Sequence, residues 1–154
     1  EIGDLGTITN WTVQFWMLSE DVADYRNILH TNFPASGTSN IGVRFEQYST
    51  GALKIGVSSD DTWRSNTVTP NLKPHTWYHV AAVGNASSNT LRVYLNGTLT
   101  VEDTSHTSWP ISFDNVTIGK GFSNDAARHF QGTIDDVSVH SRALSPDEIH
   151  SVQL

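Results

Sequence analysis

Hydrophobic and polar residues alternate along most of this chain, and this period of two constrains the fold more than any other feature of the sequence. In the segment WTVQFWML, residues 11–18, Val13, Phe15 and Met17 fall on one face of an extended chain. An amphipathic helix would instead repeat its apolar residues every 3.6 positions. The alternation therefore predicts β-strands that are buried on at least one side.

The same alternation recurs between segments rich in turn residues. Strands are predicted at residues 11–18, 26–31, 41–48, 53–58, 66–69, 77–84, 90–95, 98–101, 115–118 and 130–140. Asn96-Gly97 separates two of them and predicts a type I′ hairpin, because both turn residues need positive φ. Ser145, Pro146 and Glu148 predict one capped helical turn. This order indicates an all-β fold, an antiparallel two-sheet β-sandwich of the jelly-roll kind.

Composition narrows the function classes. The 154 residues predict a single domain over 1–154, and the absence of cysteine excludes disulfides, thiol catalysis and cysteine-bound zinc. A formal net charge of −7 disfavours nucleic acid and anionic membrane surfaces as partners. The sequence has no apolar stretch of the length that a membrane span needs, so no membrane insertion is expected.

Five segments carry recognisable motifs. They are WTVQFWM at 11–17, WYHVAAV at 77–83, LRVYLNG at 91–97, VTIGK at 116–120 and FQGTIDDVSVHSRALSPDEI at 130–149. Their order and spacing resemble the laminin-G-like jelly roll of the concanavalin A-like lectin/glucanase superfamily, over the whole chain. The resemblance implies one laminin-G-like domain of a larger secreted or cell-surface protein, and therefore an extracellular location.

The resemblance also implies a metal site. Related jelly rolls often hold one structural calcium ion where Asp135-Asp136 stands, through the first aspartate and neighbouring backbone carbonyls. Calcium accepts six to eight oxygen ligands in loose geometry, so such a mixed ligand set suits it. Asp135 is the expected ligand and Asp136 the second candidate. The alternative is that Asp135 only caps the start of its strand.

A first candidate ligand site lies in the long loop after residue 58. Sugar recognition needs an aromatic face to stack on the ring, together with charged groups that bond hydroxyls in pairs. Asp60, Asp61, Trp63 and Arg64 supply both kinds of group within five residues. The alternative is that Trp63 packs against the core and the acids are solvated.

Four further residues, in three segments, could take part in ligand binding. Trp109 precedes Pro110 in another loop, and the loop 121–129 supplies Arg128 and His129. Arg44 lies on a polar strand face with Glu46, although a pair of this kind is usually an ordinary surface ion pair. Trp16 and Trp77 are interpreted as structural strand residues.

Catalysis is not expected. A retaining glucanase needs two carboxylates about 5–5.5 Å apart, which on a strand requires acids at alternate positions. The chain contains no such run, and no Ser-His-Asp elbow or HExxH motif. The leading hypothesis is a non-catalytic carbohydrate-binding module for a glycan or polysaccharide. The alternatives are a protein-binding adhesion domain and a simple spacer, since fold alone does not choose among them.

Overall fold

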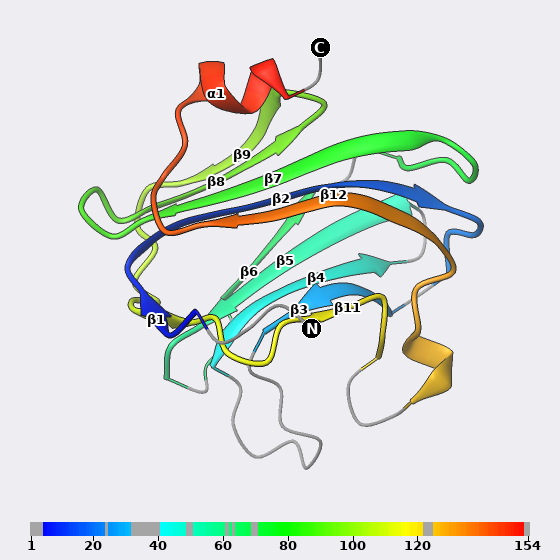
Figure 1. The fold of residues 1–154 in the computed structure, drawn as a ribbon, viewed down its shortest axis with the longest axis horizontal. Coiled ribbons are helices and arrows are strands. Elements are labelled where there is room, and N and C mark those ends of the chain that lie inside the picture. The colour runs from blue at the N-terminus through cyan, green and yellow to red at the C-terminus, as the bar shows by residue number, and fades with distance from the viewer. Residues whose placement is uncertain are drawn as a thin grey trace.

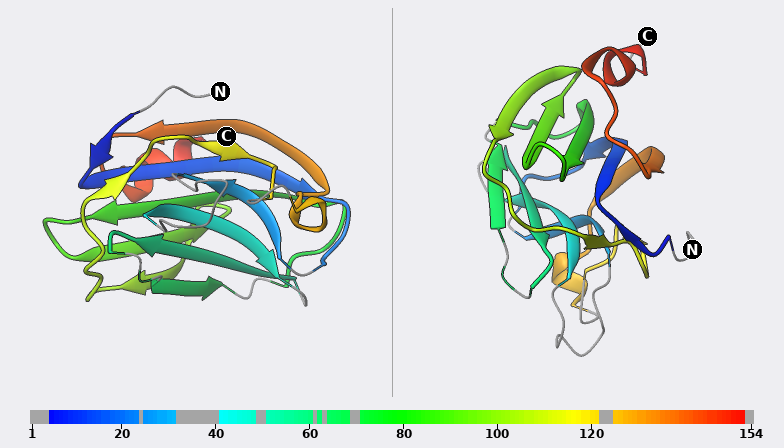
Figure 2. Two further views of the ribbon diagram at one scale, coloured as in Figure 1. Left: turned by 90° about the horizontal axis from the view of Figure 1, so that it is seen from below. Right: turned by 90° about the vertical axis from the view of Figure 1, so that its left-hand side faces the viewer.

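The computed structural model describes residues 5–23, 25–31, 41–48, 51–60, 62, 64–68, 71–121 and 125–152. These residues form two five-stranded antiparallel sheets that pack face to face, as Figures 1 and 2 show. The predicted antiparallel β-sandwich is therefore confirmed. We call the two layers the β4 sheet and the β7 sheet after their central strands.

The β4 sheet has the order β11-β3-β4-β5-β6. Its strands are β11 (Thr117–Ile118), β3 (Arg26–His30), β4 (Gly42–Tyr48), β5 (Ala52–Ser58) and β6 (Arg64–Val68). The β7 sheet has the order β12-β2-β7-β8-β9. Its strands are β12 (Gly132–His140), β2 (Asn10–Ser19), β7 (Trp77–Asn85), β8 (Thr90–Leu95) and β9 (Thr98–Asp103). Most strands lie within two residues of the predicted bounds.

Three short elements were not predicted from the sequence. Strands β1 (Thr7–Ile8) and β10 (Ile111–Ser112) pair with each other, and the 3₁₀ helix η3 (Ala126–Arg128) follows β11. Two-residue strands are too short to show a period, which is why the alternation pattern misses them. The Asn96-Gly97 hairpin between β8 and β9 is confirmed, with φ of 46° and 71°.

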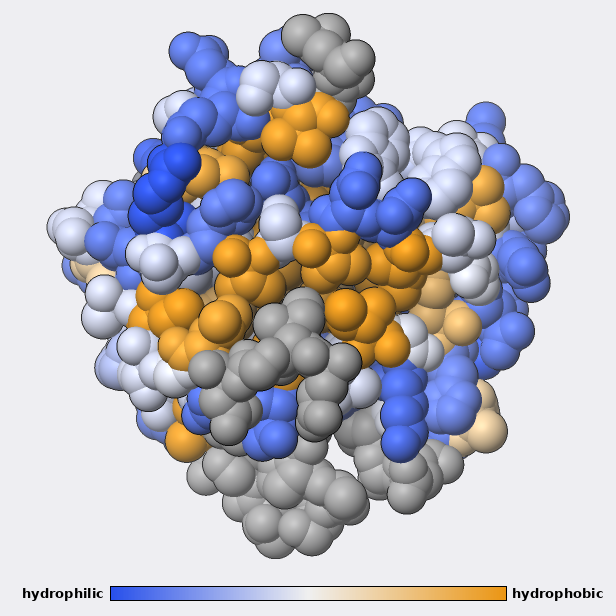
Figure 3. All heavy atoms as spheres, viewed as in Figure 1, coloured by the Kyte–Doolittle hydropathy of each residue, from blue (hydrophilic) through white to orange (hydrophobic). Residues whose placement is uncertain are grey.

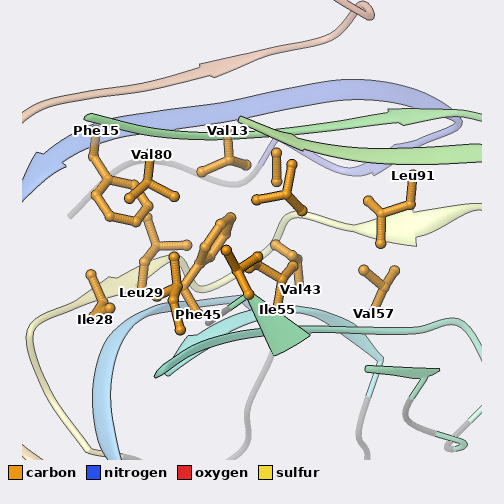
Figure 4. Close-up of a cluster of buried hydrophobic side chains, with 14 of the residues drawn as sticks. Val13, Phe15, Ile28, Leu29, Val43, Phe45, Ile55, Val57, Val80 and Leu91 are labelled. Carbon is orange, nitrogen blue, oxygen red and sulfur yellow. The ribbon is translucent and has the colours of Figure 1, made fainter. Parts of the chain in front are cut away.

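The hydrophobic core lies between the two sheets (Figure 4). Val13, Phe15 and Val80 point inward from the β7 sheet toward Val43 and Phe45 of the β4 sheet, and all five are fully buried. The rings of Phe15 and Phe45 meet edge to face, with centroids 5.2 Å apart. The predicted alternation in β2 and β4 is thus confirmed by side-chain burial.

The C-terminal helix α1 (Pro146–Ser151) lies on the outer face of the β7 sheet (Figure 1). The predicted capping box is present, because Ser145 and Glu148 each accept from the other's backbone N–H. Ile149 packs with Ala81, Val83, Tyr94 and Leu144 beneath the helix. The helix therefore covers one part of this outer face and leaves the rest open.

Strand β7 is the central strand of its sheet, and its residues 79–84 are buried. Trp77 at the start of the strand is 42% exposed, because it lies beyond the part of the outer face that α1 covers. Hydrophobic residues also gather at one edge of the sandwich, near β11 and β12, and hydrophilic residues surround them (Figure 3).

No helix within the described ranges is long and apolar enough to span a membrane.

Candidate ligand-binding face

The outer face of the β4 sheet carries polar side chains on its central strand. Val43 and Phe45 point into the core, so Arg44, Glu46 and Tyr48 must point the other way. In the register of the sheet, Glu46 stands opposite Asn27 of β3 on one side and Lys54 of β5 on the other. A row of polar residues therefore crosses the middle of the sheet on its outer surface.

Glu46 is buried at the centre of this row. Its Oε2 lies 3.1 Å from Arg44 Nε, and its Oε1 lies 3.7 Å from Arg128 Nη1. Asn27 Nδ2 donates to the same Oε1 at 3.2 Å. The Glu46 side chain is only 2% exposed, so the expected ordinary surface pair of Arg44 and Glu46 is wrong. The loop that brings Arg128 over the sheet removes Glu46 from solvent.

That loop is held in place by several contacts. Asp125 caps η3 by accepting from Ala127 N. Arg26 Nη1 donates to Ala127 O at 2.6 Å, and the backbone of His129 forms a parallel β-bridge with Asn27. The predicted candidates Arg44, Arg128 and His129 therefore come together on one face, although they are far apart in the sequence.

Two tyrosines complete this face. The rings of Tyr25 and Tyr48 meet edge to face at 4.8 Å, and the guanidinium of Arg128 lies over the Tyr25 ring at 5.1 Å. Lys54 Nζ donates to Tyr48 Oη at 3.3 Å. Tyr25 is 45% exposed, so its ring can contact a ligand. We call Tyr25, Arg44, Tyr48, Lys54 and Arg128 the arginine–tyrosine face.

Burial and positive charge set the protonation of this region. His30 of β3 stands opposite Arg44 of β4. Burial lowers the pKa of His30 to about 4, and the positive charges of Arg44 and Lys120 add to that effect. Burial also lowers the pKa of the Arg44 guanidinium, while the Glu46 carboxylate opposes this. An arginine keeps its charge under such shifts, so Arg44 remains a cation and His30 is neutral near pH 7.

A second set of predicted residues gathers elsewhere, at the edge strand β6. Arg64 forms two hydrogen bonds with the carboxylate of Asp60, at 2.9 and 3.1 Å, and donates to Ser108 Oγ at 2.8 Å. The hydrogen bonds from Arg64 hold the pKa of Asp60 at about 2. Asp61 and Trp63 lie outside the described residues.

Trp109 follows Ser108 and packs against the core cluster. Its Nε1 donates to His106 O at 3.1 Å, and its ring meets the His106 ring edge to face at 5.0 Å. The structure thus brings Asp60, Arg64 and Trp109 to one edge, but their polar groups already have partners in the protein. Trp109 as a ligand-binding residue stays a prediction.

Asp135 and Asp136 lie on the outer face of the β7 sheet, where Asp135 Oδ1 accepts from Asp136 N at 2.8 Å. No group of three or more His, Cys, Asp or Glu side chains that could bind a metal occurs among the described residues. The two aspartates alone would supply only part of the six to eight oxygens that calcium prefers. Calcium at Asp135 therefore stays a prediction.

Tyr25 and Lys54 were not predicted as site residues from the sequence. Lys54 could have been found, because Leu53 and Ile55 alternate with it and face the core, and β5 follows β4 closely in the sequence and pairs with it. Tyr25 belongs to a connecting segment and has φ of 60°, and no periodicity predicts where such a side chain points.

Two antiparallel sheets, a mostly apolar core between them and a polar outer face define a lectin-like jelly roll. A family model described as the concanavalin A-like lectin/glucanases superfamily matches residues 3–150. The chain belongs to this superfamily, which confirms the resemblance seen in its motifs. No curated protein matches the chain in sequence.

Solved structures share this fold at low sequence identity. A heptameric SAP-like pentraxin from Limulus polyphemus has a TM-score of 0.75 and 16% identity, over 99% of this chain and 73% of the other. The Ruminococcus gnavus IT-sialidase CBM40 bound to α2,3-sialyllactose has a TM-score of 0.75 and 15% identity, over 95% and 83%. The botulinum neurotoxin serotype D ligand-binding domain in complex with N-acetylneuraminic acid has a TM-score of 0.73 and 17% identity, over 99% and 38%.

Proposed function

We propose that the protein is a non-catalytic carbohydrate-binding module of an extracellular protein, and that it binds an acidic glycan on the arginine–tyrosine face. The observation that carries the proposal is that Arg128 and Lys54 lie over the rings of Tyr25 and Tyr48, beside Arg44 on the same face of the sheet. Tyrosine rings stack on sugar C–H faces, and arginine bonds a carboxylate in a bidentate manner.

Charge supports an anionic ligand. The whole chain carries −7, yet five of its nine Lys and Arg residues lie on or beside this face. They are Arg26, Arg44, Lys54, Lys120 and Arg128. Arg26 is neutralised by Asp21, Glu46 takes up part of the charge of Arg44 and Arg128, and Asp125 lies 3.6 Å from Arg128 Nε. Three carboxylates therefore face five cations. The remaining positive charge favours a sugar that carries a carboxylate.

Two of the structural neighbours were solved with acidic sugars, namely α2,3-sialyllactose and N-acetylneuraminic acid. These ligands give the first compounds to test. A shallow site with one or two aromatic rings implies a Kd of roughly 10⁻³–10⁻⁵ M.

The test is isothermal titration calorimetry or NMR titration with α2,3-sialyllactose and with lactose as its neutral counterpart. We expect the acidic sugar to bind and Arg128→Gln to lower its affinity by roughly tenfold or more, because a charge-assisted contact is lost. Lys54→Gln should weaken binding less, and Lys73→Gln, at an exposed lysine outside the face, should leave affinity unchanged.

If no glycan in a broad panel bound the protein, the proposal would be contradicted. Trp63→Ala is a further variant to test, since Trp63 was predicted as a stacking residue. If Trp63→Ala abolished glycan binding and Arg128→Gln kept normal affinity, the glycan site would be assigned to the loop that contains Trp63 and not to the arginine–tyrosine face.

A further inference from the structure

A second candidate site lies on the opposite side of the sandwich, on the outer face of the β7 sheet. Trp16, Trp77, Asp135 and Asp136 line a shallow hollow of about 220 Å³. They come from three neighbouring strands, since Trp16 of β2 pairs with Asp135 of β12 and lies beside the start of β7. Helix α1 covers another part of this face, so the hollow is open to solvent.

A β-bulge brings the two carboxylates together. In a regular strand, adjacent side chains point to opposite faces, so one of two neighbouring aspartates would point into the core. Here the pairing of β12 with β2 shifts between Asp135 and Ser138, and Ile134 and Val137 both pack against the core. Asp136 has φ of 47°, and both aspartates are exposed. The bulge thus presents two negative charges on the outer face.

These charges have no cationic partner within the described part of the chain. Among the described residues, the only hydrogen bond to either carboxylate is the one from Asp136 N to Asp135 Oδ1, and no lysine or arginine forms an ion pair with Asp135 or Asp136. Two adjacent carboxylates repel each other, so a bound positive charge is favoured at this point.

The two indoles select an organic cation. A lysine ammonium or an arginine guanidinium over the face of a tryptophan is attracted by the ring quadrupole, and tryptophan is the best aromatic partner for it. Trp77 is 42% exposed, and the ring of Trp16 contacts the ring of the buried His79, with centroids 5.3 Å apart. Because the hollow is shallow, it contacts one end of a ligand and leaves the rest outside.

We propose that this hollow binds a lysine or arginine side chain that a partner protein presents. The carboxylates of Asp135 and Asp136 pair with the cationic group, and the indoles of Trp16 and Trp77 pack on its alkyl stem and on the charge. This second site is independent of the glycan site, because it lies on the other sheet and attracts the opposite charge.

The test uses the indole N–H signals of Trp16 and Trp77 in ¹H–¹⁵N NMR spectra, assigned with Trp16→Phe and Trp77→Phe, in buffer with EDTA. The probe is a short acetylated peptide with two arginines, compared with the same peptide carrying neutral citrullines. We expect the arginine peptide to shift both signals and the citrulline peptide to bind at least tenfold more weakly. Asp135→Asn and Asp136→Asn should each weaken binding several-fold, whereas Asp147→Asn, at an exposed acid on α1, should not.

Both asparagine variants fit the local backbone. Asparagine keeps the Oδ1 that accepts from Asp136 N, and it tolerates positive φ as well as aspartate does. The proposal is overturned if both peptides bind equally, if millimolar arginine peptide moves neither indole, or if a neutral saccharide moves both indoles and the arginine peptide does not. Arg128→Gln should leave peptide binding unchanged, so failure of the glycan proposal would be visible separately.

Discussion

Glu46 Oε2 lies 3.1 Å from Arg44 Nε on the outer face of β4, and the two side chains are only 2% and 14% exposed. A buried carboxylate needs compensation by charge and hydrogen bonds, because transfer from water costs several kcal/mol. Arg44, Arg128 and Asn27 provide this compensation. The pair therefore supports the geometry of the arginine–tyrosine face as well as its charge.

Glu46→Gln should destabilise the protein by about 3 kcal/mol, because it leaves a half-buried arginine cluster without its central carboxylate. Urea unfolding measures this change. Glu102→Gln is the matched control, since the pair of Glu102 with Arg92 is solvent-exposed and should contribute less than about 1 kcal/mol. Equal effects of the two substitutions would show that burial of Glu46 has no energetic consequence.

Ile149→Ala should cost about 2–4 kcal/mol, because Ile149 is fully buried between α1 and the β7 sheet. Thermal unfolding and hydrogen exchange of the sheet amides would report the loss. His150→Ala, at an exposed position on the same helix, is the control. If Ile149→Ala proved neutral, α1 would contribute little to the stability of the sheet.

Stability should fall as the pH is lowered from 7.5 to 5. The pKa of His30 is about 4 in the folded protein and near 6.5 when unfolded, so the unfolded state binds the proton more tightly. The stabilisation that comes from neutral His30 is therefore fully present above pH 6.5 and is lost as the pH falls toward 4. His30 alone accounts for about 2 kcal/mol between pH 7.5 and 5. Burial also lowers the pKa of His79 and of His106, which adds to the trend.

His30→Gln should flatten this pH dependence, as measured by urea unfolding at several pH values. His150→Gln should leave it unchanged, because His150 is exposed. A pH profile that stays the same in His30→Gln would contradict the assignment.

The calcium prediction at Asp135 and Asp136 is tested by melting with EDTA and with 10 mM calcium. A site with a Kd of roughly 1 mM would stabilise the fold by about 1.4 kcal/mol under these conditions, and would raise the Tm by about 3–5 °C. Asp135→Asn should abolish the increase. If calcium left the Tm unchanged, the prediction of a structural calcium ion would be wrong.

Local patterns were enough to predict the strands and their inward faces. Val13 and Phe15 recur at every second position, as do Val43 and Phe45, and a buried sheet face requires that period. The Asn96-Gly97 hairpin and the Ser145 cap were also predictable, because each depends on residues that are close in the sequence.

The binding surfaces depend on contacts between distant segments, which only the tertiary structure decides. Arg128 reaches Glu46 across 82 positions of sequence because η3 folds over β3. Trp16, Trp77 and Asp135 meet because β2 lies between β7 and β12. The sequence by itself thus determined a two-sheet jelly roll and which side chains point outward. Strand order, a β-bulge and the path of one loop decided which of those side chains lie together, since these follow from packing of the whole chain.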